Sequence, residues 1–268
     1  MDLVEVEGLR IAYARTGSGP PVALAHGFVA DGLSTWASQI DALSSEFTVI
    51  AWDAPGAGQS ARPPESFRAA DYADCWASFL RALGFPRAHL VGLSFGAIVA
   101  LALVDRDPTM VSSLALVGGY AGWRGSLTEA EVDARLNACL RVSELPPEEF
   151  ARAMIPSMFS TAAAQTAVDG FAAVVRRFDP AGFRTMARMS AEADLRHVLP
   201  QVDVPTLLLY GDQDERAPLR VAEGIREGIP SAQLVVLPGV GHVSPVEAPD
   251  AVSRVLGDFL RVADARRH

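Results

Sequence analysis

Short runs of apolar residues alternate with amphipathic segments at both ends of the chain. Near-continuous apolar runs are typical of strands that a sheet buries on both faces, and they occupy residues 22–26, 48–52, 88–93, 114–117, 206–210 and 233–237. Between these runs, apolar residues at helical spacing predict helices at about residues 34–43, 68–83, 95–106, 219–227 and 249–262. Residues 3–15, with Gly8 as the turn, predict an antiparallel hairpin. The alternation favours an α/β fold with a mostly parallel sheet flanked by helices.

The middle of the chain, from about residue 122 to residue 199, has no strand-like run, and its apolar residues recur at helical spacing. Ser126 and Glu129 have the spacing of a capping box that opens a helix. The sequence PPEE at residues 146–149 predicts a proline-led, acid-rich start of another helix. We therefore expect an α/β core made of residues 1–121 and 196–268, interrupted by an all-helical cap of residues 122–195.

Composition and charge limit the kinds of molecule that this protein is expected to bind. A chain of 268 residues, of which 50% are hydrophobic, is long enough to bury the core of one sheet-based domain with an insertion. The net charge of -9 disfavours phosphate backbones and anionic lipid, so neither nucleic acid nor a membrane is expected as a partner. The acidic N-terminus lacks the pattern of a secretory signal, and no run of apolar residues is long enough to span a membrane. The expectation is a cytoplasmic protein that acts on a small molecule, alone or as a homodimer.

The two cysteines, Cys75 and Cys139, lie far apart in the sequence and have no second cysteine or histidine at ligand spacing. Neither a zinc site nor a disulfide framework is therefore expected. Both cysteines are predicted to be buried free thiols.

The strongest chemical signal is the sequence GLSFG at residues 92–96, a G-x-S-x-G motif between a predicted strand and a predicted helix. In this context the two glycines allow a sharp turn and close packing of the strand against the helix. The turn is expected to hold Ser94 in a strained conformation, with its hydroxyl exposed as a nucleophile. The start of the following helix favours negative charge nearby.

A serine hydroxyl needs a base within hydrogen-bonding distance, normally a histidine that a carboxylate orients. His242 follows the last predicted strand directly, so it lies at the carboxyl edge of the sheet, where Ser94 also lies. The other histidines have no such reason to meet Ser94, since they lie near loops, in a polar stretch or at the end of the chain: His26, His89, His197 and His268. Of these, His89 is expected to face a loop. We therefore predict that His242 is the general base.

The carboxylate that orients His242 is expected in the sequence GDQD at residues 211–214, just after a predicted strand. Asp214 is the better candidate, because it can reach out of the strand end toward the histidine loop. Asp212 lies in the turn, where it can accept hydrogen bonds from local backbone amides. The resulting chain order of serine, aspartate and histidine is the one expected for this motif.

Acyl transfer also needs hydrogen-bond donors for the oxyanion that forms on the substrate carbonyl. Two backbone amides are predicted to supply them. One is the N–H of Phe95, next to the nucleophile, and the other is the N–H of Phe28, in the loop after the strand at residues 22–26. His26 is expected to brace that loop rather than to transfer a proton.

These motifs resemble those of α/β-hydrolase fold enzymes with a helical cap, over essentially the whole chain. The matching pieces are HGF at residues 26–28, Trp36, DAPGAGQS at 53–60, GLSFG at 92–96, GDQD at 211–214 and GH at 241–242. The resemblance implies an eight-stranded sheet, a cap at about residues 122–195, and no metal or organic cofactor. Ala97 departs from the pattern, because a second glycine often follows the motif there. Haloalkane dehalogenases and epoxide hydrolases of this fold use an aspartate nucleophile, so Ser94 argues against both.

The predicted cap is rich in methionine and aromatic residues, which adapt to irregular apolar shapes and so favour a hydrophobic substrate. These are Trp123, Met154, Met158, Phe159, Phe171, Phe178, Phe183, Met186 and Met189. Any single one of them more often packs cap helices together than lines a pocket. No arginine or lysine is tied to the site by the sequence, and Arg124, Arg176 and Arg177 are expected on solvated faces.

The function that the sequence favours is hydrolysis of a carboxylic ester or lactone through an acyl-serine intermediate. Two other reactions use the same residues, namely carbon–carbon bond hydrolysis of a vinylogous diketone and cofactor-free perhydrolysis. A protein of another class, a non-catalytic ligand receptor, can also keep this fold and these residues. Turnover of a p-nitrophenyl ester that is lost in Ser94→Ala distinguishes an enzyme from a receptor.

Overall fold

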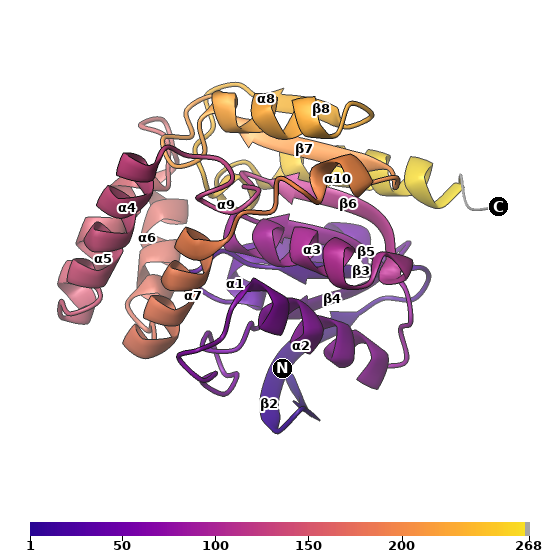
Figure 1. The fold of residues 1–268 in the computed structure, drawn as a ribbon, viewed down its shortest axis with the longest axis horizontal. Coiled ribbons are helices and arrows are strands. Elements are labelled where there is room, and N and C mark those ends of the chain that lie inside the picture. The colour runs from indigo at the N-terminus through magenta and orange to yellow at the C-terminus, as the bar shows by residue number, and fades with distance from the viewer. Residues whose placement is uncertain (266–268) are drawn as a thin grey trace.

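The computed structural model describes residues 1–265 and joins eight strands in one sheet, in the order β1-β2-β4-β3-β5-β6-β7-β8 (Figure 1). The strands are Asp2–Val6 (β1), Leu9–Thr16 (β2), Pro21–Ala25 (β3), Thr48–Trp52 (β4), Ala88–Leu93 (β5), Val111–Val117 (β6), Thr206–Gly211 (β7) and Gln233–Leu237 (β8). β1 pairs antiparallel with β2, and β2 with β4, whereas the other neighbouring strands are parallel. The predicted α/β fold with an eight-stranded, mostly parallel sheet is confirmed.

Helices cover both faces of this sheet. α2 (Ala69–Ala82) packs against α3 (Phe95–Arg106), and α1 (Gly32–Leu43) packs against α10 (Pro249–Ala265), while α8 (Leu219–Gly228) packs on β7 (Figure 1). Every residue of α3 from Phe95 to Val104 is buried, which explains why this segment is apolar all round rather than amphipathic. The most enclosed helix of the fold therefore follows Ser94 directly.

β6 is longer than the apolar run at residues 114–117 predicts, because a polar pair is buried inside the sheet. His89 lies within β5 and is fully buried, with its Nδ1 atom 2.8 Å from the Ser113 hydroxyl oxygen in β6. Its Nε2 atom lies 3.5 Å from Asp264 on α10. The expectation that His89 faces a loop is therefore wrong, since the histidine links two strands and a helix.

The segment between β6 and β7 carries four α-helices, gathered at one end of the sheet (Figure 1). They are α4 (Glu129–Val142), α5 (Pro147–Met154), α6 (Gln165–Val175) and α7 (Pro180–Glu192). α5 begins at the predicted proline pair, but the capping box of α4 is formed by Thr128 and Glu131 rather than by Ser126 and Glu129. The Ser126 hydroxyl instead accepts the Ala121 N–H in the preceding turn, so it is not available to cap the helix.

Aromatic side chains hold the helices of this segment together. The rings of Phe150 and Phe178 are stacked, and both meet the ring of Phe183 edge-on. Full burial of one such side chain stabilises a fold by roughly 1.5–3 kcal/mol. Several of the apolar residues noted in the sequence of this segment therefore pack its helices against one another.

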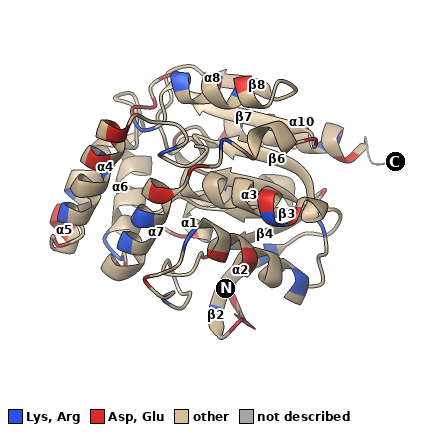
Figure 2. Ribbon diagram, in the orientation of Figure 1, with Lys and Arg blue, Asp and Glu red and all other residues tan. Residues whose placement is uncertain are grey.

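Charged contacts between this helical segment and the rest of the chain lie at the surface. Figure 2 shows acidic and basic residues interspersed on outer helices such as α4 and α5. Exposed ion pairs join the segment to the core at Arg62–Asp179, Arg68–Glu192 and Arg220–Glu131. Such exposed pairs contribute little to stability. Within residues 1–265, no helix combines the length and apolarity needed to cross a bilayer.

Asp179→Ala is expected to destabilise the protein in a way that depends on pH. Asp179 caps α7 by accepting the Gly182 N–H at 3.0 Å, and it also binds Arg62. Burial opposes ionisation, but the hydrogen bonds from Arg62 and from Gly182 outweigh it and hold the pKa of Asp179 below its usual range. Loss of a helix cap costs about 1 kcal/mol.

The sign of the pH dependence follows from this lowered pKa. The stabilisation by Asp179 is fully present above the pKa of the unfolded chain, about 3.9, and is lost as the pH falls through the lower folded value. Urea unfolding at pH 7 and pH 3 measures the difference between wild type and variant, which should shrink at pH 3. Asp203→Ala, at an exposed position, is the control. An equal loss at both pH values would show that the charge of Asp179 has no role.

Candidate active site

The turn between β5 and α3 holds Ser94 in a conformation that L-residues rarely adopt. Its φ is 53°, and its N–H donates to the Val117 carbonyl at 2.9 Å. A Cβ at Gly92 would lie 2.3 Å from the Gly96 carbonyl oxygen, and a Cβ at Gly96 would lie 2.4 Å from the Ala25 carbonyl oxygen. Both glycines of the motif are therefore required sterically, and the strain of about 1–3 kcal/mol at Ser94 is held by the surrounding strands.

Ser94 is buried, with 3% of its surface exposed, whereas the sequence predicts an exposed hydroxyl. The reason is that Met158 and Phe171 of the helical segment close over the strand ends and line a small cavity together with Ser94. The other residues that line this cavity are Gly27, Phe28, Val29, Leu93, Arg216, His242 and Val243. The cavity has room for about one water molecule.

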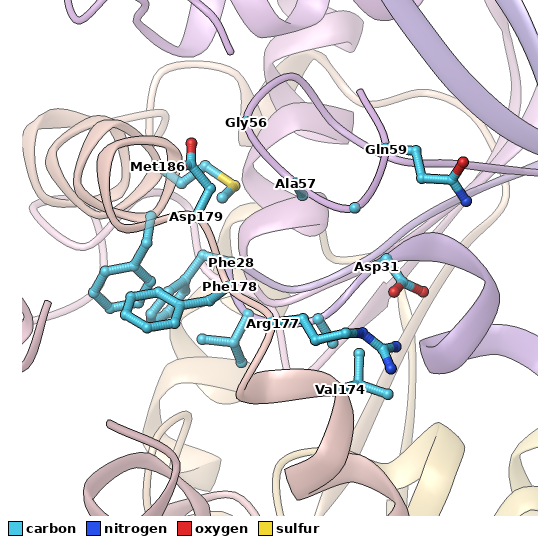
Figure 3. A pocket seen from close by; sticks show the side chains of 14 residues that line it. Phe28, Asp31, Gly56, Ala57, Gln59, Val174, Arg177, Phe178, Asp179 and Met186 are labelled. Atoms are coloured by element: carbon cyan, nitrogen blue, oxygen red, sulfur yellow. The ribbon is translucent and has the colours of Figure 1, made fainter. Parts of the chain in front are cut away.

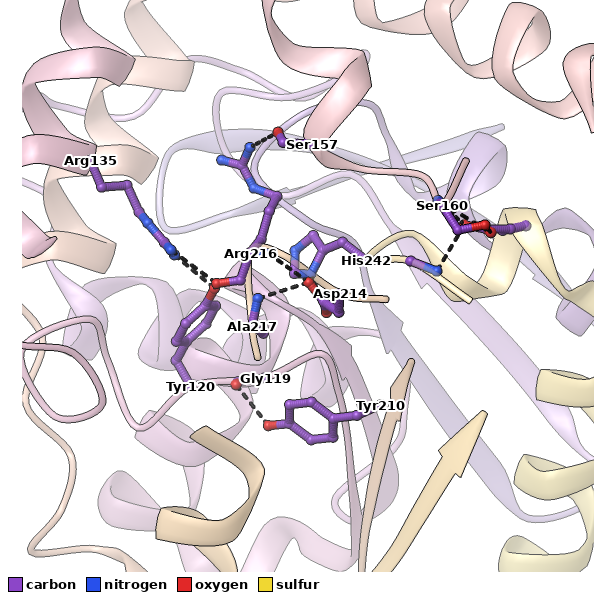
Figure 4. Close-up of polar contacts among 12 residues, drawn as sticks. Gly119, Tyr120, Arg135, Ser157, Ser160, Tyr210, Asp214, Arg216, Ala217 and His242 are labelled. Carbon is purple, nitrogen blue, oxygen red and sulfur yellow. Dashed lines mark hydrogen bonds and ion pairs between the residues drawn. The ribbon is translucent and has the colours of Figure 1, made fainter. Parts of the chain in front are cut away.

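Asp214 and His242 are in contact within the same buried region, and each is 5% exposed. The His242 Nδ1 atom lies 2.8 Å from Asp214 Oδ2 (Figure 4). Because an ionised carboxylate can only accept hydrogen bonds, Nδ1 carries the proton and Nε2 is left as the acceptor of the ring. His242 and Ser94 line the same cavity, so the loops after β5, β7 and β8 bring all three predicted residues to one edge of the sheet.

The two aspartates of the loop after β7 have different partners. The second oxygen of Asp214, Oδ1, accepts the N–H groups of Arg216 and Ala217, each at 2.8 Å. Asp212 is exposed, and its Oδ1 atom accepts the Gly239 N–H at 2.7 Å. Of the two candidates that the sequence offers, Asp214 is the one that contacts His242.

Gly118, at the end of β6, packs against this pair and was missed in the sequence. Its φ is +48°, and a Cβ there would lie 3.1 Å from both Asp214 Oδ2 and His242 Nδ1. Only glycine fits this position without crowding either group. Two adjacent glycines directly after a predicted strand were the available signal.

The two predicted oxyanion donors lie on segments that are tied together. Phe28 lines the cavity beside Ser94. Phe95 is the first residue of α3, where a backbone N–H has no acceptor inside the helix. The Gly96 N–H donates to the His26 carbonyl at 3.1 Å, which joins the two segments. His26 Nε2 accepts the Ala54 N–H at 2.9 Å, consistent with a bracing role.

Asp53, within the sequence DAPGAGQS, anchors the loop that carries Phe28. Its carboxylate accepts the N–H groups of Gly32 and Gln59, each at 2.9 Å. Burial raises the pKa of Asp53, and the two backbone hydrogen bonds act in the opposite direction. Asp53 therefore links two loops at the edge of the site without lining the cavity over Ser94.

The remaining histidines lie elsewhere. His89 is inside the sheet, and His197 is exposed with its Nε2 atom 3.4 Å from Asp105. His268 falls outside the described residues. The cavity over Ser94 is lined by His242 and by none of the other histidines in residues 1–265.

Arg216 is a second residue of the site that the sequence did not point to. It follows Asp214 by two positions and lines the cavity with Ser94 and His242. Its Nη1 group donates to the Ser157 hydroxyl at 2.6 Å, and its guanidinium lies 5.4 Å from the centre of the Phe28 ring. Its closeness in sequence to Asp214 was the signal that could have drawn attention to it.

Phe28 also lines a second, larger cavity of about 340 Å³. Figure 3 shows Phe28 and Phe178 on one side of it, with Asp31 and Arg177 on the other. Phe28 and Val29 line both cavities. The two cavities therefore share part of one wall.

The described part of the chain contains neither a metal-binding cluster nor a reactive thiol. In residues 1–265, no cluster of three or more histidine, cysteine or acidic side chains could hold a metal ion. Cys75 and Cys139 are free and buried, as predicted. Burial raises the pKa of the Cys75 thiol to about 12, so it stays protonated and unreactive.

Comparisons with known proteins agree with this geometry. A sequence model described as the alpha/beta hydrolase family matches residues 22–255. The chain is 26% identical over 266 residues to the serine hydrolase BPHL of Mus musculus, covering 96% of this chain and 85% of the mouse protein.

Two solved structures are also similar. A thermophilic esterase from Thermogutta terrifontis has a TM-score of 0.90 and 28% identity, covering 98% of this chain and 99% of the esterase. A meta-cleavage product hydrolase from Pseudomonas fluorescens IP01 has a TM-score of 0.84 and 25% identity, with 98% of each chain covered. The similarities therefore extend over the whole of the described fold.

Proposed function

This chain belongs to the alpha/beta hydrolase family and is a hydrolase, and we propose that it cleaves a carboxylic ester or lactone through an acyl-serine intermediate. One observation carries the proposal. The 2.8 Å contact between His242 Nδ1 and Asp214 Oδ2 fixes the imidazole with Nε2 as acceptor, in the cavity that Ser94 also lines. The similar esterase from Thermogutta terrifontis supports ester substrates.

The reaction proceeds in two halves. Ser94 Oγ attacks the substrate carbonyl carbon while His242 Nε2 takes the serine proton, and the oxyanion accepts hydrogen bonds from the N–H groups of Phe28 and Phe95. When the carbon–oxygen bond to the leaving group breaks, His242 returns the proton to the departing alcohol. A water molecule then gives a proton to His242 and attacks the acyl carbon. The bond from this carbon to Ser94 Oγ breaks, the acid is released, and His242 returns the proton to Ser94 Oγ.

Residues 122–195 act in this proposal as a cap that excludes bulk water and shapes the substrate. Met158 and Phe171 from this segment line the cavity together with Leu93 and Phe28 from the core. An apolar enclosure strengthens the hydrogen bonds to the oxyanion and favours a hydrophobic acyl or aromatic group.

A second candidate is hydrolysis of a carbon–carbon bond in a vinylogous diketone. It is favoured by the similarity to the meta-cleavage product hydrolase, and it uses the same nucleophile and base. A 4-nitrophenyl ester and a vinylogous diketone assayed side by side distinguish the two, because the preferred substrate gives the higher kcat/KM.

Intact-mass spectrometry after incubation with a fluorophosphonate tests the proposed function. The wild-type chain is expected to gain one adduct on Ser94, and neither Ser94→Ala nor His242→Ala should react, since the serine needs its base. His197→Ala, at an exposed histidine, should react like wild type. A folded wild-type protein without an adduct would contradict the proposal and favour a non-catalytic receptor.

A further inference from the structure

The backbone of Arg216 is fixed on both sides by hydrogen bonds. Its N–H donates to Asp214 Oδ1 at 2.8 Å, and its carbonyl accepts from Arg135 Nη2 at 2.9 Å and from the Tyr120 hydroxyl. Figure 4 shows the side chain running from this loop past His242 toward Ser157. The loop that orients the catalytic base therefore also directs a guanidinium along the wall of the cavity over Ser94.

The positive charge of Arg216 is not neutralised by the described residues. In residues 1–265, no carboxylate forms an ion pair with its guanidinium. One of its five N–H groups donates to the neutral Ser157 hydroxyl, and its face lies over Phe28. Burial lowers the pKa of Arg216 and the nearby positive charge of Arg135 adds to this effect, whereas Asp214 acts in the opposite direction. The carboxylate of Asp214, two positions before Arg216, already accepts hydrogen bonds from His242 and from two backbone amides.

A charge in such surroundings favours an anion as its partner. Arginine keeps its proton in proteins, so partial burial leaves a guanidinium with lost hydration and no compensating charge. Apart from Arg216, Ser94 and His242, the side chains that line the cavity are apolar, and they include Phe28, Leu93, Met158 and Phe171. The planar fork of a guanidinium matches a carboxylate with two parallel hydrogen bonds, which are strong because both groups are charged.

We propose that Arg216 binds a carboxylate of the substrate beside Ser94, so that the natural substrate is an ester or lactone bearing a free carboxylate. This inference rests on the proposed function and names its substrate class. The contact with Ser157 suggests the competing explanation, in which Arg216 only fastens the helical segment to the core. A test must therefore separate recognition of charge from loss of this contact.

Two matched pairs of esters separate recognition of charge from loss of the contact with Ser157. One pair carries the carboxylate on the acyl side, the 4-nitrophenyl monoester of adipic acid against 4-nitrophenyl hexanoate. The other pair carries it on the alcohol side, 4-acetoxybenzoate against its methyl ester. In at least one pair, wild type should prefer the charged ester in kcat/KM. Arg216→Gln should lower that preference about 30- to 300-fold, mostly through KM, because a charged hydrogen-bonded pair is lost.

Two control variants distinguish the explanations. Ser157→Ala removes the hydroxyl that Arg216 contacts but keeps the guanidinium, so it should keep the preference for the charged ester. Arg220→Gln removes an equal charge at the surface, where Arg220 pairs with Glu131, and should behave like wild type. If Ser157→Ala lowers the preference as much as Arg216→Gln, or if wild type prefers the neutral ester in both pairs, the proposal is wrong.

A binding measurement keeps this inference separate from the proposed chemistry. Adipate titrated into Ser94→Ala in a calorimeter should bind, and the added Arg216→Gln substitution should abolish binding. Turnover of neutral esters, with no adipate binding and no preference for the charged ester in either pair, would overturn the carboxylate site and leave the proposed function intact. Adipate binding that depends on Arg216, in a protein that hydrolyses no ester of either pair, would support the site and overturn the proposed function.

Discussion

Ser94→Ala is expected to lower kcat for ester hydrolysis by about 10,000-fold or more, because no other group in the cavity replaces the nucleophile. The free energy of unfolding should change by less than about 1 kcal/mol, since alanine meets the same backbone strain at φ 53° and leaves no large void. Initial rates with a 4-nitrophenyl ester and urea unfolding of the same preparations measure both quantities.

Ser112→Ala is the matched control for this variant. Ser112 is also a buried serine, in β6, and its hydroxyl has no hydrogen-bond partner within residues 1–265. Its replacement should leave the rate close to that of wild type. Residual activity in Ser94→Ala above about one hundredth of the wild-type rate would mean that another residue begins the reaction.

Asp214→Asn is expected to lower kcat by about 10,000-fold, because the asparagine amide offers a donor where His242 Nδ1 needs an acceptor. The imidazole then keeps its proton on Nε2 and cannot take the proton of Ser94. The remaining amide oxygen can still accept the N–H groups of Arg216 and Ala217, so the loop is expected to stay in place. Rates of ester hydrolysis and of fluorophosphonate labelling should fall together.

Asp212→Asn is the control for this assignment. Asp212 lies two positions earlier on the same loop, is exposed, and contacts the Gly239 N–H instead of the histidine. Its replacement should change the rate by less than about threefold, as is usual for exposed positions outside a site. A large loss in Asp212→Asn with a small loss in Asp214→Asn would reverse the roles of the two aspartates.

Most of the sheet could be predicted from the sequence, because strands buried on both faces leave a local and unambiguous pattern. The bounds of β4, β5, α3 and β8 agree with the predicted segments. β6 begins earlier than predicted because the polar Ser113 lies inside it. The Ser113 hydroxyl forms its hydrogen bond with His89 on the neighbouring strand. A pairing between strands cannot be seen in either segment alone.

The candidate site, like the sheet, could be predicted only in part. Ser94, Asp214 and His242 each follow a predicted strand directly, so a parallel sheet brings them to one edge. The backbone of Arg216 is held by a hydrogen bond from Arg135, which lies 81 residues away in the chain. The closed state of the cavity depends on Met158 and Phe171, whose packing over Ser94 leaves no mark in the sequence.

The position of the helical segment has a consequence for how such a protein can evolve. β6 and β7, which flank the segment, are adjacent in the sheet and pair directly, from Leu114 opposite Thr206 to Val117 opposite Leu209. The hydrogen bonds of the sheet therefore do not pass through the segment, and Ser94, Asp214 and His242 all lie outside it. If the proposed function holds, mutations, insertions or exchange of these helices can alter which substrates bind, while Ser94, Asp214 and His242 are inherited unchanged.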